Sequence, residues 1–337
     1  MGAHICHPFD GSVRSLEDTG GVARVLMVAC DYRYAGPMAI SGIRDGQNFE
    51  RIARHGHAAD IVFMRDDVDP GHPLYPSQPN VIRQIQGLGR RCRPGDYFVF
   101  FFAGHGVSVP DESGDEKDGF DEAYLLPNPA TSRLTPMIDD IWADVVDNAL
   151  HPEVSVLAIT DCCHSETITD IDSHSWGWRP ICSMAACRDQ EQSWDTGRGG
   201  MLTRAIEQAI LTLGRRHGSS EYSIEEMWDE VVGYVGAHKK GQFQAPVLDY
   251  RNMHPRSEAW PLPQSWWSNA PGRIPAKMGQ DARMVRHHMT RNTGVRDGDL
   301  YADPYMPAPY GYPTAGAPLY MGPAQGAYTS SIVPVYG

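Results

Sequence analysis

The sequence lacks the features that would place the protein in or across a membrane. None of its apolar runs reaches the roughly eighteen residues that a transmembrane helix needs. The opening residues, M-G-A-H-I-C-H-P-F-D, contain no apolar segment of the signal-peptide kind, and Cys6 stands where a myristoylation signal has Ser or Thr. We therefore expect a soluble, cytoplasmic protein without a membrane partner.

The sequence also lacks the even number and the spacing of cysteines that a disulfide framework needs. The chain has seven cysteines, an odd number, and their spacing matches no disulfide framework. This favours a reducing compartment over a secreted, disulfide-bonded scaffold. The cysteines are Cys6, Cys30, Cys92, Cys162, Cys163, Cys182 and Cys187.

Basic residues are too few for a nucleic-acid-binding protein. The chain has 29 Lys and Arg against 42 Asp and Glu, a net charge of −13. Residues 256–337 carry seven basic and five acidic side chains, so the acidic surplus lies in the first 255 residues. Nucleic acid requires a basic surface, and we expect no such partner. An acidic domain instead suits a basic substrate or a divalent cation, although diffuse negative charge also serves solubility.

Apolar runs of strand type alternate with helical patterns along the first 255 residues. This alternation predicts an α/β fold whose central sheet is mostly parallel and carries helices on both faces. We interpret Val107–Pro129 as a long acidic loop. The expected strands cover 22–32, 58–64, 97–102, 154–160, 181–186 and 244–248, and the expected helices cover 42–55, 80–88, 138–150, 199–213 and 223–235.

Composition divides the chain into three parts. Residues 1–20 are polar and are interpreted as a flexible arm, and 21–255 as the folded domain. Residues 256–337 begin with a Trp-containing linker, and the last 37 positions hold seven Tyr and seven Pro with almost no charge, which is typical of a low-complexity tail. Three tryptophans are expected to hold the start of this tail against the domain: Trp260, Trp266 and Trp267.

Two of the expected strands end in reactive side chains. The run at 96–106 ends in His105, and the run at 156–165 ends in Cys163. Chemistry in open α/β sheets gathers at the carboxyl ends of the strands. A thiol at one strand end and an imidazole at another predict a cysteine nucleophile with a histidine partner. The amides of Gly106 and Cys163 are candidates for stabilising an oxyanion.

Each of these residues also has an ordinary structural interpretation. Most buried cysteines are inert packing, and a histidine in a Gly-rich turn is often structural. His164 is a rival base, but neighbouring residues point apart, so we treat it as structural. A zinc site at 162–164 is disfavoured because three consecutive residues cannot surround a tetrahedral ion.

Several segments together resemble metacaspases, the caspase-related cysteine peptidases of plants, fungi, protists and bacteria. The resemblance spans roughly residues 22–250, with large-subunit-like residues 21–172 and small-subunit-like residues 178–250. It rests on I-R-D-G-Q-N-F at 43–49, F-F-F-A-G-H-G at 100–106, K-D-G-F-D-E-A-Y-L-L-P at 117–127, I-D-D at 138–140, D-C-C-H-S at 161–165 and S-M-A-A-C-R-D-Q-E-Q-S at 183–193.

The resemblance implies a caspase-like sandwich and cleavage of peptide bonds after Arg or Lys. Cys163 matches the nucleophile and His105 the general base and acid. Asp45 and Asp161 match the acids that line the pocket for a basic side chain, which a carboxylate pair would hold and which would reject an acidic one. The family further implies autoprocessing and a role in programmed cell death, and we expect a monomer.

The same resemblance implies activation by Ca²⁺, a cation that oxygen ligands suit. The matching acids are Asp121, Asp139, Asp140 and Asp170. Solvated loop charge also explains them without a metal, as does, for Asp139 and Asp140, the preference of acids for a helix N-terminus. The residues by themselves favour this explanation.

Three residues depart from the family pattern near the nucleophile. Ala103 replaces a Ser and removes a hydroxyl from the substrate pocket, Cys162 replaces another Ser and adds a thiol, and Glu166 replaces a Gly and adds a charge. The sequence therefore leaves two hypotheses open. The first is a calcium-stimulated endopeptidase, and the second is a weakly active or inactive scaffold that recruits partners through its C-terminal tail.

Overall fold

The computed structural model describes residues 13–262 apart from 112–113, 115–118, 132, 164, 173, 189–199, 218–220 and 239–244. These residues belong to a compact unit, Met1–Arg273, and a second unit, Ile274–Gly337, lies outside the described part. The predictions for the tail, for Trp266 and Trp267 and for His164 therefore lie outside it as well. No helix among the described residues has both the length and the apolar character needed to span a bilayer.

A six-stranded sheet forms the centre of the domain, in the order β2-β1-β3-β7-β8-β9. Neighbouring strands are parallel except for β8 and the edge strand β9, which are antiparallel. The predicted mostly parallel sheet is confirmed. Its strands are β1 (Ala23–Ala29), β2 (Asp60–Arg65), β3 (Tyr97–Ala103), β7 (Ser155–Asp161), β8 (Ile181–Ala185) and β9 (Val247–Arg251).

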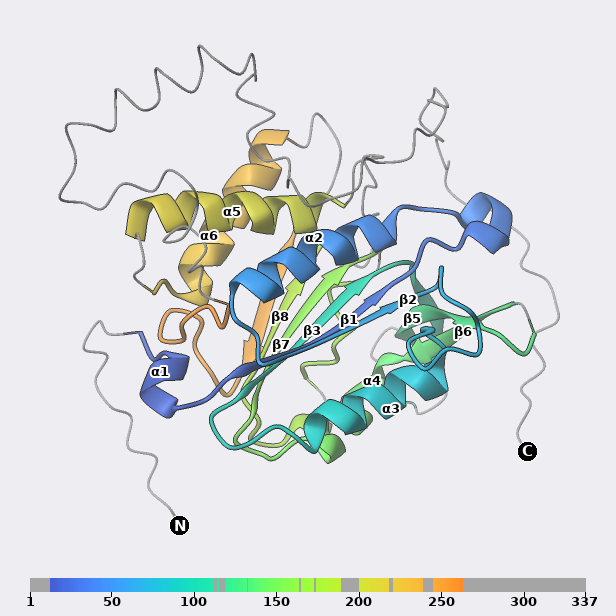
Figure 1. Cartoon of the computed structure of the whole chain (residues 1–337), viewed down its shortest axis with the longest axis horizontal. Coiled ribbons are helices and arrows are strands. Elements are labelled where there is room, and N and C mark those ends of the chain that lie inside the picture. The colour runs from blue at the N-terminus through green and yellow to red at the C-terminus, as the bar shows by residue number, and fades with distance from the viewer. Residues whose placement is uncertain are drawn as a thin grey trace. The chain divides into compact units, whose positions relative to one another are not determined.

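Helices cover both faces of this sheet, as Figure 1 shows. One face carries α2 (Gly42–His55), α5 (Met201–His217) and α6 (Ile224–His238), and the other carries α3 (Gln78–Gly89) and α4 (Asp139–Ala149). Successive side chains of a strand point to opposite faces, so a strand buried on both is apolar throughout. The core on the side of α2, α5 and α6 is called the first core, and the core on the side of α3 and α4 the second. Alternate side chains of β3 belong to each: Tyr97, Val99, Phe101 and Ala103 to the first, and Phe98, Phe100 and Phe102 to the second.

A capping box marks the start of α6. The Ser223 hydroxyl accepts from the Glu226 N–H at 3.1 Å, and the Glu226 carboxylate accepts from the Ser223 N–H at 2.8 Å. Helix α3 begins directly after Ser77, earlier than the expected residue 80. The short helices are α1 (Leu16–Thr19), η1 (Arg33–Met38) and η2 (His174–Trp176).

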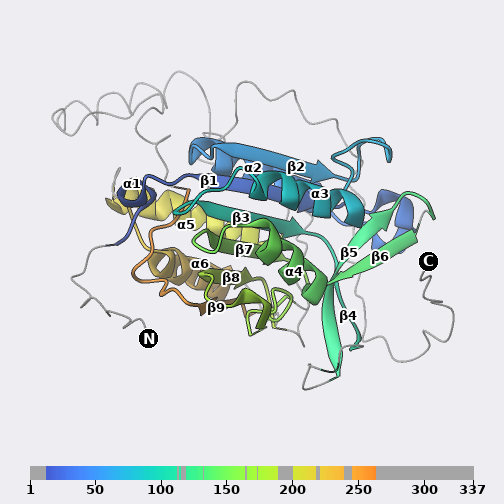
Figure 2. The same cartoon turned by 90° about the horizontal axis from the view of Figure 1, so that it is seen from below.

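The expected acidic loop at 107–129 is wrong. Its described residues contribute to an antiparallel sheet of β4 (Gly106–Pro110), β5 (Phe120–Asn128) and β6 (Arg133–Ile138). Tyr124 of β5 packs edge-on against Phe102 at the end of β3, with ring centroids 4.8 Å apart. This sheet lies beyond the carboxyl ends of the parallel strands (Figure 2), because β4 follows β3 after a two-residue turn.

Both ends of the described chain are tied to the domain. Arg14 pairs with Glu258 through its guanidinium at 3.0 Å, and its backbone bridges to the same segment. Trp260 and Leu262 are 2% and 0% exposed in the first core, so the prediction that Trp260 holds the chain against the domain is confirmed. Packing therefore extends beyond the expected boundaries at residues 20 and 255.

Candidate functional site

The two predicted reactive residues lie at adjacent strand ends. Ala103 of β3 pairs with Asp161 of β7 in parallel register, so His105 and Cys163 each stand two residues beyond that pair. A Cβ atom added to Gly106 would lie 2.0 Å from the carbonyl oxygen of Cys163, which means that the two segments touch. The fold thus places His105 and Gly106 beside Cys163.

His105 is held at its backbone and at its ring. Its Nε2 lies 2.7 Å from the carbonyl oxygen of Met38, and its N–H donates to the hydroxyl of Tyr32 at 2.9 Å. A carbonyl oxygen only accepts, so Nε2 carries the proton and Nδ1 is the nitrogen that can take one. Burial lowers the pKa of His105 from its usual 6.5, which favours the neutral ring.

Cys163 is half-buried directly after β7. The chain beyond it is anchored by Ser165, whose hydroxyl donates to the carbonyl of Cys187 at 3.1 Å and accepts from the Cys187 N–H at 3.2 Å. No α-helix begins at Cys163 within the described residues, so no helix N-terminus assists its thiol there. His105 is therefore the candidate group for activating the thiol.

Cys162 occupies a different environment from its neighbour. It is 1% exposed, and its Sγ lies 3.2 Å from the position of a Cβ on Gly106. The thiol of Cys187 donates to the carbonyl oxygen of Cys162 at 3.4 Å. None of the six described cysteines forms a disulfide. Cys162 therefore packs behind the site.

The backbone amide of Gly106 faces away from β5. The Leu125 N–H donates to the His105 carbonyl at 3.0 Å, which makes this a hydrogen-bonded position of the antiparallel pair. Such positions alternate along a ladder, and the next pair, Gly106 with Tyr124, is of the other kind. The Gly106 N–H is therefore directed out of the ladder, as an oxyanion donor requires.

Asp45 and Asp161 meet at the start of α5. The Gly200 N–H donates to Asp45 Oδ2 at 2.8 Å, and a Cβ on Gly200 would lie 2.2 Å from Asp161 Oδ2. Thr203 donates to the same Asp161 oxygen from its N–H at 2.9 Å and its hydroxyl at 2.8 Å. Both acids are buried, at 4% and 6% exposure. Sequence reasoning missed Gly200 and Thr203, which carry no motif of their own.

Ala103 does not line an open pocket. Its exposure is 1%, and it belongs to the core beneath α2. Its carbonyl oxygen accepts from the Cys30 N–H at 3.0 Å. The residue contributes to packing at the strand end, beside Asp161 in register.

The four predicted calcium ligands lie on β5, at the start of α4 and in the loop that follows Cys163, which we call the nucleophile loop. Asp121 is in β5, Asp139 and Asp140 open α4, and Asp170 follows Cys163 with a φ of 42°. Burial, together with the charges of Asp170 and Glu122, raises the pKa of Asp139 to about 8. Within the described residues, no three His, Cys, Asp or Glu side chains are gathered into a metal-binding group.

Glu122 links these acids to the nucleophile loop. Its N–H donates to Asp139 Oδ2 at 3.2 Å, and its carboxylate accepts from Ser108 at 3.2 Å and from the hydroxyl of Thr167. Sequence reasoning gave Glu122 no role. The only feature of the sequence that pointed to Glu122 was the pair Asp121 and Glu122 within the expected acidic loop.

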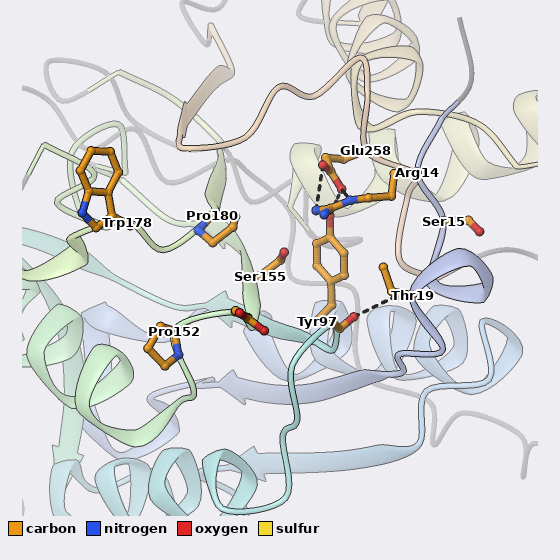
Figure 3. A pocket seen from close by; sticks show the side chains of 11 residues that line it. Arg14, Ser15, Thr19, Tyr97, Pro152, Ser155, Trp178, Pro180 and Glu258 are labelled. Carbon is orange, nitrogen blue, oxygen red and sulfur yellow. Dashed lines mark hydrogen bonds and ion pairs between the residues drawn. The ribbon is translucent and has the colours of Figure 1, made fainter. Parts of the chain in front are cut away.

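A cavity of about 200 Å³ lies at the opposite, amino-terminal edge of the parallel strands (Figure 3). Tyr97, the first residue of β3, donates from its hydroxyl to Glu258 at 3.2 Å, and Arg14 pairs with the same carboxylate. These polar groups are hydrogen-bonded or ion-paired with one another. We therefore assign them to joining the two chain ends and not to substrate binding.

A metacaspase peptidase C14 domain matches residues 23–172. The chain is 26% identical over 248 residues to Metacaspase-2 of Arabidopsis thaliana, covering 63% of this chain and 59% of that protein. It is 31% identical over 154 residues to Metacaspase-1 of Yarrowia lipolytica, covering 45% of this chain and 33% of that protein. Residues 23–172 are therefore similar to the peptidase C14 domain of metacaspases.

A solved structure shares the fold. The crystal structure of protein GSU0716 from Geobacter sulfurreducens superposes with a TM-score of 0.50 at 20% identity, over 72% of this chain and 97% of that one. The predicted caspase-like fold is confirmed. The chain spans between a third and three-fifths of the length of the two curated relatives named above.

The contact between Gly106 and Cys163 predicts the effect of adding a single methyl group. Gly106→Ala should lower the free energy of unfolding by about 1–3 kcal/mol and slow alkylation of Cys163, because one of two abutting backbones must move. Urea unfolding and the rate of iodoacetamide labelling measure the two effects. Gly233→Ala in α6 is the control, since its Cβ would meet nothing within 4 Å. Equal stability of both variants would contradict the contact.

Proposed function

We propose that this protein is a metacaspase, a cysteine endopeptidase that cleaves after Arg or Lys. The observation that carries the proposal is the pairing of strand ends, which brings Gly106 against the backbone of Cys163 and so places the neighbouring His105 at the same edge of the sheet, with its Nε2 proton held by the carbonyl of Met38. That bond leaves Nδ1 as the proton acceptor. The similarity to metacaspases supports the same chemistry.

The mechanism follows from these groups. His105 takes the proton of the Cys163 thiol, and the thiolate attacks the substrate carbonyl. The amides of Gly106 and Cys163 donate to the oxyanion. His105 then gives its proton to the leaving amine, and a water activated by His105 hydrolyses the acyl-enzyme. Met38 keeps the imidazole in one tautomer through the cycle.

The acids at the start of α5 support a preference for basic side chains. Asp45 and Asp161 place two buried carboxylates about the same glycine, Gly200, next to the strand end that leads to Cys163. A desolvated carboxylate pair attracts a guanidinium or ammonium group and repels an acidic side chain. The substrates we propose are proteins or peptides with Arg or Lys before the scissile bond.

The donor set near Asp139 supports calcium stimulation. All four predicted ligands, Asp121, Asp139, Asp140 and Asp170, offer carboxylate oxygens, which Ca²⁺ prefers. The raised pKa of Asp139 shows that a buried negative charge there is costly beside its acidic neighbours. Bound Ca²⁺ would offset that charge, and it would draw together these four residues, which the described structure does not gather into one group. Asp170 belongs to the loop after Cys163, so ion binding would favour one position of that loop.

Two further proposals rest on the sequence. We propose that the protein is a cytoplasmic monomer and that it processes itself after basic residues. Size-exclusion chromatography and mass spectrometry of the purified protein test the oligomeric state and the cleavage.

The choice of nucleophile predicts different outcomes for two neighbouring thiols. Cys163→Ala should abolish cleavage of a fluorogenic Arg peptide, whereas Cys162→Ala should keep most of it, because Cys162 is buried behind the site. Initial rates with and without Ca²⁺ measure both. Equal loss in the two variants would show that the wrong thiol was chosen. No turnover by the wild type under either condition would favour a scaffold that recruits partners.

The two buried acids, Asp45 and Asp161, predict a preference for substrates with a positively charged side chain. Wild-type protein should prefer an Arg peptide over its neutral isostere citrulline, and Asp45→Asn should lower kcat/KM for the Arg peptide by about 10²-fold or more, as for a lost buried charge pair. The citrulline peptide is the internal control, because a folding defect lowers both rates alike. Cleavage after Asp at a comparable rate would overturn the specificity.

The calcium proposal predicts a separation between two acids of α4. Asp140→Ala should need more Ca²⁺ for half-maximal rate, whereas Asp144→Ala, which removes the same charge one turn later, should behave as wild type. Affinity should be modest, with activation between micromolar and millimolar ion, because the ligands come from separate elements. Calorimetric titration with CaCl₂ gives a readout independent of turnover. An unchanged wild-type rate in saturating chelator would contradict the proposal.

A further inference from the structure

The hydroxyl of Tyr32 stands between His105 and Leu125. It accepts from the His105 N–H at 2.9 Å and donates to the Leu125 carbonyl at 2.7 Å. In the opposite direction the Leu125 N–H donates directly to the His105 carbonyl at 3.0 Å. An antiparallel pair of this kind normally exchanges both bonds directly. One of the two bonds is here replaced by a side-chain hydroxyl.

We propose that Tyr32 is a positioning residue for His105, setting the place of the imidazole by inserting its hydroxyl between the ends of β3 and β5. This inference rests on the proposed role of His105 in catalysis. The inserted oxygen holds the His105 backbone away from Leu125 by the width of one hydroxyl. It also satisfies a donor and an acceptor that would otherwise be buried without partners.

Tyr32 is fixed by contacts that do not involve His105. It is 0% exposed and has a φ of 51°, an uncommon conformation for a bulky residue. The carboxylate of Asp66 accepts from the N–H groups of Asp31 and Tyr32, each at 2.8 Å, and secures that turn. Tyr32 is therefore a rigid support, and His105 is the group that adapts to it.

The surrounding chain leaves space for this hydroxyl. A Cβ on Gly104 would lie 2.5 Å from the Tyr32 oxygen, so glycine at that position permits the contact. The Tyr32 and His105 rings lie 4.8 Å apart between centroids. Met38, which accepts from His105 Nε2, ends the η1 segment that follows Tyr32. The short stretch 32–38 therefore contacts His105 twice, at its backbone N–H through Tyr32 and at its ring through Met38.

Tyr32→Phe tests the inference, because phenylalanine fills the same space and removes the hydroxyl alone. We expect kcat for an Arg peptide to fall tenfold or more with KM changed less than twofold, since the loss misplaces the base and not the substrate pocket. Loosening should also admit water to His105 and return its pKa toward 6.5. The acidic limb of kcat/KM should therefore move to higher pH.

Tyr124→Phe is the matched control. Its hydroxyl is also buried, and it has no hydrogen-bond partner among the residues that the structure describes. This variant should leave kcat and the pH profile unchanged. If Tyr32→Phe also leaves both unchanged, or if Tyr124→Phe shifts them equally, the inference is overturned.

A second readout separates this inference from the proposed peptidase activity. The rate of Cys163 alkylation by iodoacetamide, followed by mass spectrometry against pH, requires the thiol and His105 but no turnover. A shifted profile in Tyr32→Phe supports the positioning role even if wild-type protein cleaves no peptide, and an unshifted profile overturns it. If Tyr32→Phe does not fold, 4-aminophenylalanine at position 32 keeps a donor to Leu125 but offers His105 a poorer acceptor, and the same shift is expected.

Discussion

The contact between Gly106 and the carbonyl oxygen of Cys163 is the constraint on which the site depends. With no side chain at Gly106, two backbone segments from adjacent strand ends approach more closely than any other residue allows. The parallel register of β3 and β7 brings the segments to the same edge of the sheet. This approach sets the segment of His105 and Gly106 beside that of Cys163, and the Gly106 amide points out of the β4–β5 ladder.

Buried acids dominate the electrostatics around this contact. Asp45 and Asp161 receive hydrogen bonds from the start of α5, and Asp139 lies among other carboxylates at the start of α4. Ionised carboxylates lose their hydration on burial, so each such group requires donors or a cation. Donors at the start of α5 supply this at one group, whereas at the other group the pKa of Asp139 is raised to about 8.

The antiparallel sheet of β4, β5 and β6 connects the segment of His105 and Cys163 with the acids at the start of α4. Through β4 and β5 it carries Gly106, Glu122 and Leu125, which contact the Cys163 carbonyl, the N-terminus of α4 at Asp139, and His105. Asp139 is thus two hydrogen bonds from the loop after Cys163, one to Glu122 and one from Thr167 to Glu122.

The sequence by itself determined the elements whose signals are local. Continuous apolar runs gave the parallel strands, helical periodicity gave α2, α4, α5 and α6, and reactive residues at two strand ends identified Cys163 and His105. The motif order was specific enough to indicate the metacaspase family. These features depend on neighbouring residues in the chain, so composition and spacing reveal them.

Only the tertiary structure decided the parts that depend on distant contacts. Asp121 and Glu122 look like loop residues, yet they lie in a buried strand because Tyr124 packs beneath β3. The carbonyl of Met38 and the hydroxyl of Tyr32 carry no motif, because a backbone group is the same in every residue and its role comes from what stands opposite it. Hydrogen bonds act over about 3 Å in space at any separation in sequence, and so the fold alone assigns them.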